Sequence, residues 1–165
     1  MSSSSSLMGW VSNTQEPKRI NRYELLLTDN LRLTCKSVTM PTISVDEVDI
    51  HRMHNFYKVA GSKIEYANVT CVFYDFVDGL AETAIEAWHN SIYNVNTSLM
   101  GFPQSYKQNV TLLIYGPDQS VVESWVLVGA WPKSFARKPL SWEDKNGVQE
   151  ITLELLIDEV TITVS

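Results

Sequence analysis

The chain has 165 residues, a formal net charge of −6, a pI near 5.0 and a mean hydropathy of −0.10. This length suits one domain with a single core, and no apolar run approaches the roughly 18 residues that a membrane-spanning helix needs. The excess of acidic residues argues against a protein that binds nucleic acid tightly, because such proteins gain most of their affinity from contacts between basic side chains and phosphates. The charge suits either general solubility or a surface past which nucleic acid slides.

The first part of the chain differs from the rest. Residues 1–18 are rich in serine and show no periodicity, which predicts a flexible arm before a single domain over residues 19–165. The serine run Ser2–Ser6 lacks the basic and apolar regions of a secretory signal. Two cysteines, Cys35 and Cys71, lie in apolar stretches. Two are too few for a disulfide framework, so we expect reduced, buried thiols.

Alternating apolar and polar residues predict antiparallel strands along most of the chain. Tyr23–Thr28 and Leu31–Val38 flank Asp29–Asn30, a two-residue connection typical of a hairpin. We expect residues 42–60 to form an extended loop that reaches outside the domain, because acids and histidines interrupt its apolar positions. A further strand is expected from Tyr66 to Tyr74.

One amphipathic helix is expected from Gly79 to Tyr93. Its apolar residues recur at helical spacing and form one stripe: Leu80, Ala84, Ile85, Trp88 and Ile92. Asp78 is expected to cap the first turn, because its carboxylate can accept hydrogen bonds from the free amides there.

The second half of the chain predicts three more strands, Lys107–Tyr115, Val121–Trp131 and Val148–Ile157, with a turn at Gly116–Asp118. Pro132 is expected to end the second of these, because proline cannot donate to a strand ladder. A loop is expected from Phe135 to Trp142. The elements together predict a mainly β (α+β) fold, an antiparallel β-sandwich or barrel flanked by one α-helix.

The residue types that carry chemistry do not form a recognised site. His51 and His54 lie in an extended segment, where residues three apart point to opposite faces, so we predict no metal site. Asp75, Asp78 and Glu82 surround a helix start, where acidic residues are common for electrostatic reasons. The chain has no glycine-rich phosphate loop and no nucleophile motif. We therefore predict that the protein is not an enzyme and uses no cofactor.

Five blocks of sequence occur in a fixed order. They are a strand ending in proline at Leu33–Pro41, Tyr57–Ser62 before the strand to Tyr74, the helix with Ala87–Trp88 near its end, Pro103–Lys107 entering a strand, and Gly129–Pro132 followed by Leu140–Trp142 and a final strand. In order and spacing, this set resembles the tail tube proteins of contractile-tailed bacteriophages of the T-even type and of related contractile injection systems. The resemblance covers the chain from about Tyr23 to Ile157.

The resemblance implies a structural subunit of the inner tube of a contractile tail. In that family, rings of six subunits stack into a hollow conduit for DNA delivery. The implied partners are further copies of the chain, the tail sheath protein and baseplate proteins, with the tape measure protein and DNA in the lumen. No sequence-specific DNA binding and no membrane anchor are implied. The expected location is the virion tail, after assembly in the cytoplasm of the host bacterium.

The resemblance suggests candidate residues for three surfaces of the protein. The extended loop is expected to contact neighbouring subunits through Ile43, Val45, Val48, Ile50, His51, Met53, His54, Phe56 and Tyr57. Glu150, Thr152 and Glu154 alternate with apolar residues of the last strand and are expected to face the lumen, a simply solvated strand face being the alternative. Glu82, Glu86 and His89 on the helix are expected to face the sheath.

Other roles remain open from the sequence. Within the same class, the alternatives are a baseplate homologue that initiates the tube and the tube of a phage-derived injection system. From another class, the alternative is a carbohydrate-binding β-sandwich that uses exposed aromatic side chains. Glycan binding by an isolated monomer that does not assemble would favour that alternative.

Overall fold

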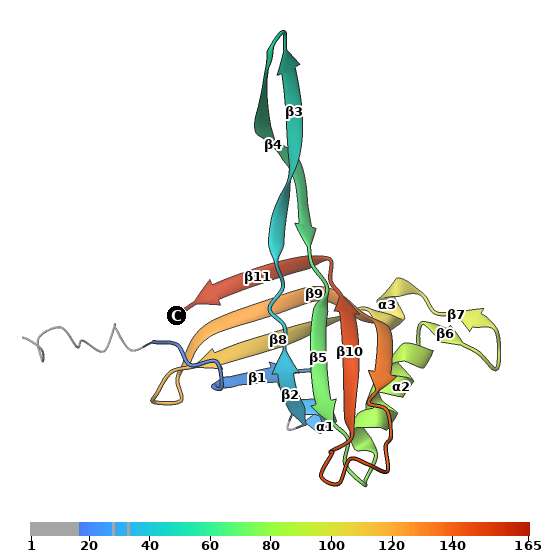
Figure 1. The fold of residues 1–165 in the computed structure, drawn as a ribbon. Helices are drawn as coiled ribbons and strands as arrows, with labels where there is room; N and C mark the ends of the chain where they lie inside the picture. Colours follow the sequence, from blue (N-terminus) through green and yellow to red (C-terminus); the bar gives the residue numbers. More distant parts are fainter. Residues whose placement is uncertain (1–16, 28, 33) are drawn as a thin grey trace, which may run out of the picture.

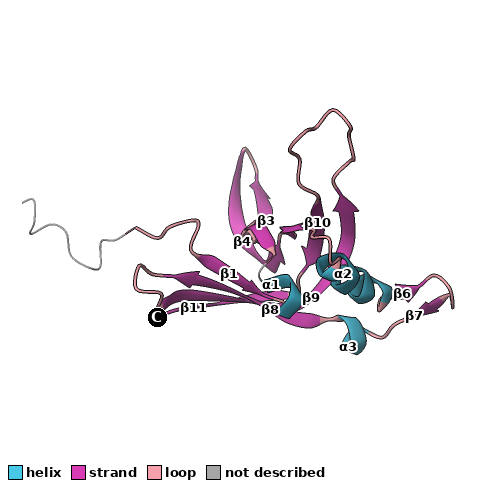
Figure 2. Ribbon diagram, turned by 90° about the horizontal axis from the view of Figure 1, so that it is seen from below, coloured by secondary structure: helices cyan, strands magenta, loops and turns pink. Residues whose placement is uncertain are grey.

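The computed structural model describes residues 17–27, 29–32 and 34–165. Almost all of the expected arm, residues 1–18, lies outside the described residues. The strands form two antiparallel sheets that share one long strand, β9 (Val121–Arg137), together with two separate two-stranded hairpins (Figures 1 and 2). The mainly β, antiparallel fold predicted from the sequence is confirmed.

The two sheets have a simple order. Sheet A runs β1 (Tyr23–Leu26), β8 (Gln108–Tyr115), the first half of β9, and β11 (Glu159–Val164). Sheet B runs from the second half of β9 through β10 (Glu150–Leu156) and β5 (Val69–Tyr74) to β2 (Cys35–Val38). The strands of sheet B cross those of sheet A at a steep angle (Figure 1).

The long strand β9 continues through Pro132, so the prediction that this proline ends the strand is wrong. Glu154 opposes Ser134 and Leu155 opposes Pro132, which leaves Lys133 without an opposite residue at a β-bulge. A bulge is one of the few places in a sheet where proline is tolerated, because the ladder is already interrupted there. Residues 135–137, expected in a loop, therefore belong to β9.

The core follows the expected alternation along the strands. The fully buried side chains include Val69, Cys71 and Phe73 of β5 and Ile151, Leu153 and Leu155 of β10. Every second side chain of a strand points to the same face, so these residues fill the space between the sheets. Their neighbours at the intervening positions lie on the outward face of sheet B.

The predicted helix is present as α2 (Leu80–Asn90), which packs Ala81 and Ile85 into the core. Its N-cap position is Gly79, with φ 63°, and not Asp78. Asp78 still satisfies one free amide, because its Oδ1 accepts a hydrogen bond from the backbone N–H of Leu80 at 3.2 Å. Two four-residue helices that the sequence did not predict are also present, α1 (Asp29–Arg32) and α3 (Pro103–Tyr106).

The hairpin predicted around residues 29–30 is wrong. β1 pairs with β8 in sheet A, whereas β2 pairs with β5 in sheet B, and α1 connects them. Leu31 of α1 is fully buried. A helical turn that places this side chain in the core replaces the tight hairpin turn, and the chain crosses from one sheet to the other.

The extended segment forms a long hairpin of its own, β3 (Ile43–Arg52) and β4 (Asn55–Tyr66), which projects from one end of sheet B (Figure 1). β4 takes residues up to Tyr66, so the strand expected to begin there begins at Val69 instead. A second, small hairpin joins β6 (Tyr93–Asn94) to β7 (Leu99–Met100). Among the described helices, none is long and apolar enough to cross a membrane.

Candidate assembly surfaces

The β3–β4 hairpin has one apolar face that is exposed. Directly opposed residues of an antiparallel pair share a face, and towards the tip of the hairpin the apolar pairs are Val48 with Val59 and Ile50 with Tyr57. We call these four residues the apolar hairpin face. All four are exposed in the isolated chain. Two further apolar pairs, Ile43 with Tyr66 and Val45 with Ile64, lie nearer the base of the hairpin. An exposed apolar surface of this kind marks an interaction site.

A β-bulge separates the two groups of apolar pairs. The register shifts between Val45 and Glu47, where β3 has one residue, Asp46, and β4 has three, residues 61–63, so the extra residues lie on β4. Gly61 lies against the bulge, where a Cβ would come 2.9 Å from the Asp46 carbonyl oxygen. The bulge explains why this segment lacked regular strand spacing in the sequence.

The nine residues predicted to contact neighbours divide between the base, the two faces and the turn of the hairpin. Val48, Ile50 and Tyr57 lie on the apolar hairpin face, and Ile43 and Val45 lie in the two apolar pairs nearer the base. His51 and Phe56 form a pair on the opposite face, with ring centroids 6.2 Å apart. Met53 and His54 form the turn, with Met53 at φ 47°.

The three residues predicted to face a lumen lie together on the outward face of sheet B, where Thr152 is exposed and Glu150 and Glu154 are half-buried. Lys36 Nζ donates a hydrogen bond to Glu150 Oε1 at 2.6 Å. This bond lowers the pKa of Glu150 below its ordinary value. The ammonium of Lys36 also lies 5.6 Å from the ring centroid of Tyr74.

Glu154 has one partner just before β5 and one on β9. Asn68 Nδ2 donates to its Oε1 at 2.7 Å, and Ser134 Oγ donates to its Oε2 at 3.1 Å. These two hydrogen bonds lower the pKa of Glu154, and the bond from Asn68 has the larger effect. Lys133, the residue at the bulge, lies 3.6 Å from the same carboxylate. Both acids therefore have a lysine beside them, and this face carries balanced charge.

The three residues predicted to face a sheath behave differently from one another. Glu82 forms an ion pair with Arg137 at the end of β9. The ring of His89 packs edge-on against Phe135, with centroids 5.3 Å apart. Glu86 is exposed. Two of the three side chains therefore attach α2 to β9, and Glu86 is the one that faces outward.

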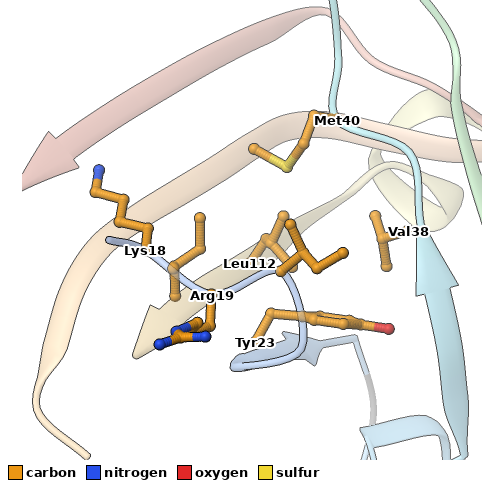
Figure 3. Close-up of a pocket in the computed structure, with 8 residues that line it drawn as sticks. Lys18, Arg19, Tyr23, Val38, Met40 and Leu112 are labelled. Atoms are coloured by element: carbon orange, nitrogen blue, oxygen red, sulfur yellow. The ribbon is translucent and has the colours of Figure 1, made fainter. Parts of the chain in front are cut away.

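A pocket of about 260 Å³ lies beside β1 and β8, below Met40 (Figure 3). Its lining is mostly apolar, including Tyr23, Val38 and Leu112, and Lys18 extends away from these side chains. Lys18 forms an ion pair with Glu123. In the part of the chain that the structure describes, no group of three or more metal-ligating residues occurs. The pocket offers no set of groups for acid–base or nucleophilic chemistry.

Comparison with known families decides what kind of fold this is. A model of the phage tail tube protein family matches residues 7–158. The chain belongs to this family. Tail tube proteins are structural and not enzymatic, so the resemblance seen in the sequence and the prediction that the protein is not an enzyme are both confirmed. A search of curated protein sequences found no match.

Solved structures share the tail tube fold over nearly the whole chain. A chain in the sheath–tube complex of the PVC extracellular contractile injection system, in its extended state, is 19% identical, with a TM-score of 0.73 over 93% of this chain and 95% of that one. A chain in the baseplate of the anti-feeding prophage is 13% identical, with a TM-score of 0.70 over 90% and 97%. The SPP1 tail tube is 11% identical, with a TM-score of 0.55 over 87% and 76%. At these identities the likeness is one of fold.

The structure also brings together exposed apolar residues that the sequence did not single out for assembly. Phe76 and Val77 follow β5, and Leu140 and Trp142 follow β9; all four are exposed. The signal was present in the sequence, since Leu140 and Trp142 are large apolar residues in a loop rich in polar residues, proline and glycine.

Proposed function

We propose that this tail tube protein forms rings of six copies, which stack into the inner tube of a contractile phage tail or of a phage-derived contractile injection device. The observation that carries the proposal is the exposed apolar hairpin face. An isolated two-stranded hairpin is marginally stable in water. A projecting hairpin with exposed apolar residues is therefore expected to be covered by another subunit.

The sheet edges support the same proposal. Within the described residues, β1 and β11 border sheet A and β2 borders sheet B, each with a strand partner on one side alone. Open edges present free backbone groups to any strand that can pair with them. Head-to-tail pairing of identical chains closes into a ring when the rotation permits. Pairing between copies would extend the sheets around a central channel.

The outward face of sheet B is the surface that we assign to the lumen. Its lysines, Lys36 and Lys133, lie beside Glu150 and Glu154. DNA phosphates bind proteins by displacing counterions with free lysine and arginine side chains. A face whose cations are already paired with carboxylates offers DNA little to bind. This balance suits a conduit that delivers DNA, along with the tape measure protein, without sequence-specific binding.

The remaining partners follow from the position of such a tube in a contractile tail. The sheath protein would contact the outside of the tube, and Glu86 on α2 is the candidate residue there, with Glu82 and His89 holding the helix in place. Baseplate proteins would contact the first ring. The location would be the tail of a virion or the shaft of an injection device, assembled in the bacterial cytoplasm.

The experiment compares two double variants of the hairpin. Val48→Glu with Ile50→Glu charges the apolar hairpin face, whereas Ala60→Glu with His51→Glu places the same charges on the opposite face. All four side chains are exposed, so both variants should melt at the wild-type temperature. Negative-stain microscopy, with protein alone and with baseplates from the same source, is expected to show wild-type tubes with a stained central channel.

The first double variant should give no tubes and the second should give tubes. Wild-type protein that stays monomeric under both conditions would overturn the proposal. So would tubes formed equally well by the Val48→Glu, Ile50→Glu variant. Glycan binding by wild-type protein that stays monomeric would favour the carbohydrate-binding alternative.

A further inference from the structure

The core face of sheet A extends beyond the part that sheet B covers. Two rows of side chains lie on this face, towards the end of sheet A that is farther from sheet B: Leu25, Leu112, Trp125 and Ile162, then Tyr23, Ile114, Glu123 and Val164. Leu25 and Leu112 are buried, whereas Ile162 and Val164 are exposed. The β-sandwich is therefore open at this end of sheet A.

The pocket beside β1 and β8 lies on this open end. Tyr23, Leu112 and Ile114 of the core face line it, together with Ile20 and Met40 (Figure 3). Ile20 is almost fully exposed, and Met40 is exposed as well. Apolar cavities of about 150 Å³ bind benzene. This pocket, of about 260 Å³, therefore has room for a large apolar side chain.

The β6–β7 hairpin exposes apolar side chains of that kind. Among the described strands, β6 and β7 pair with each other alone. Leu99, Met100 and Phe102 each expose more than two thirds of their surface, and Val95 in the turn does so too. A cluster of apolar side chains as exposed as these indicates contact with another molecule.

The base of this hairpin is held in place. The backbone N–H of Gly101 donates to the carbonyl oxygen of Ile92 at 2.8 Å, and Trp88 Nε1 of α2 donates to the carbonyl oxygen of Tyr106 in α3 at 2.7 Å. A Cβ at residue 101 would collide with the carbonyl oxygen of Ser91, so the close approach of the two segments requires glycine. A hairpin fixed in this way loses little conformational freedom when it binds.

The β6–β7 hairpin and the pocket lie on opposite sides of the molecule. In both views the hairpin lies on one side, and β1, which borders the pocket, lies on the other side with the C-terminus (Figures 1 and 2). The β3–β4 hairpin projects in a different direction, across the line that joins them (Figure 1). The β6–β7 hairpin is therefore placed to reach the pocket of a second copy and not that of its own chain.

The two sides also have complementary charge. Residues 64–106, which contain α2 and the β6–β7 hairpin, include five acidic residues and no lysine or arginine. Residues 17–22, which lead into β1 beside the pocket, include three basic residues and no acidic residue. An ion pair within the chain takes one charge from each set, that of Glu82 and that of Lys18. Complementary charge favours the approach of unlike sides and disfavours the pairing of like sides.

We propose that the β6–β7 hairpin of one copy inserts into the pocket of the next copy around the ring. Met100 and Phe102 occupy the pocket, where they contact Tyr23 and Leu112 of the receiving chain, and the hairpin covers the open end of its sheet A. The two surfaces differ from each other, so the contact is head-to-tail and is completed when the ring closes. This inference rests on the proposed function and adds a side-chain contact between lateral neighbours to the pairing of sheet edges.

The first test compares alternate positions of the β6–β7 hairpin. Met100→Glu with Phe102→Glu charges the side chains that enter the pocket, whereas Thr97→Glu with Leu99→Glu places the same charges on the alternate positions. All four side chains are exposed, so both variants should melt at the wild-type temperature. The first double variant is expected to raise the protein concentration needed for tube assembly, measured by sedimentation, by about tenfold or more. The second should change it by less than about threefold.

A disulfide tests the position of the contact. A chain carrying Phe102→Cys and Ile20→Cys is assembled, oxidised and separated by denaturing electrophoresis. Neighbours around a ring would be linked into a ladder of species that ends at six copies. Trp142→Cys replaces Phe102→Cys in the control chain, which should give no ladder, because Trp142 is also exposed but lies in the loop between β9 and β10.

The outcomes separate this inference from the proposed function. Tubes that give no ladder, or that assemble equally well with Met100→Glu and Phe102→Glu, would overturn the inference while the proposed function stands. A ladder that continues past six copies would also overturn it, because the contact would then run along the stack. Wild-type chains that form no tubes would instead remove the proposed function.

Discussion

Gly129 and Asp158 lie so close that a Cβ at position 129 would come 2.3 Å from Asp158 Oδ2. Gly129 has φ 67° and lies where β9 passes from sheet A to sheet B. Asp158 Oδ2 also accepts a hydrogen bond from Lys107 Nζ at 2.6 Å. The passage of β9 between the sheets therefore needs glycine both for its backbone conformation and for space.

We expect Gly129→Ala to lower the free energy of unfolding by about 2 kcal/mol or more, from left-handed backbone strain together with displacement of Asp158. Gly79→Ala is the matched control, because Gly79 also has positive φ, 63°, but nothing lies within 4 Å of its added Cβ. It should cost about 1 kcal/mol, the strain alone. Urea denaturation followed by circular dichroism measures both, and equal losses would contradict the role of Asp158.

The two faces of β10 should respond differently to truncation. Leu153 is fully buried and its neighbour Thr152 is exposed. Leu153→Ala is expected to destabilise the fold by about 2–5 kcal/mol, because it leaves a cavity between the sheets. Thr152→Ala should change stability by less than about 0.5 kcal/mol. Urea denaturation of the two variants tests this, and a small loss for Leu153→Ala would contradict the assignment of the core face.

Both cysteines should be unreactive in the folded protein. Burial raises the pKa of the Cys71 thiol to about 12 and that of Cys35 to about 11. The thiolate is the reactive form, so at pH 8 both should react with a thiol reagent more than about a hundredfold more slowly than a free cysteine. Denaturant should make both reactive at once. The exposed thiol of a Met53→Cys variant is the positive control, and rapid labelling of the native wild-type protein would refute the prediction.

Stability should fall in acid, partly through Glu123. The ammonium of Lys18 lowers the pKa of this carboxyl, and Trp125 Nε1 donates to its Oε1 at 2.6 Å. A folded-state pKa below the unfolded value of about 4.5 means that the stabilisation is present above that pH and is lost as pH falls through the folded pKa. The melting temperature should therefore decline below about pH 4.5.

Glu123→Gln should make that decline shallower, because the variant has no carboxyl to protonate at this position. Glu86→Gln, at an exposed position of α2, is the matched control and should leave the acid profile unchanged. Thermal melts from pH 3 to 7 compare the three proteins. Identical slopes for wild type and Glu123→Gln would show that Glu123 is not a source of the acid sensitivity.

The candidate surfaces were partly predictable. The apolar residues of the β3–β4 hairpin stood out in the sequence, but which of them share a face depends on the register between the two strands, including the bulge at residues 61–63 of β4. The lysine partner of Glu150 could not be foreseen, because Lys36 lies 114 residues away in the chain. Its place beside Glu150 follows from the pairing of β2 and β10 with β5.

The sequence by itself determined which sides of β5 and β10 face inward. The alternation in these strands is a local property, because each side chain's direction follows from the backbone repeat around it. In the predicted stripe of α2, Ile85 is buried but Leu80 is exposed. Tertiary structure alone decided how those elements pair. β1 and β2 belong to different sheets, and β9 continues through Pro132. Neither could be predicted locally, because strand pairing depends on burial and register between segments far apart in the chain.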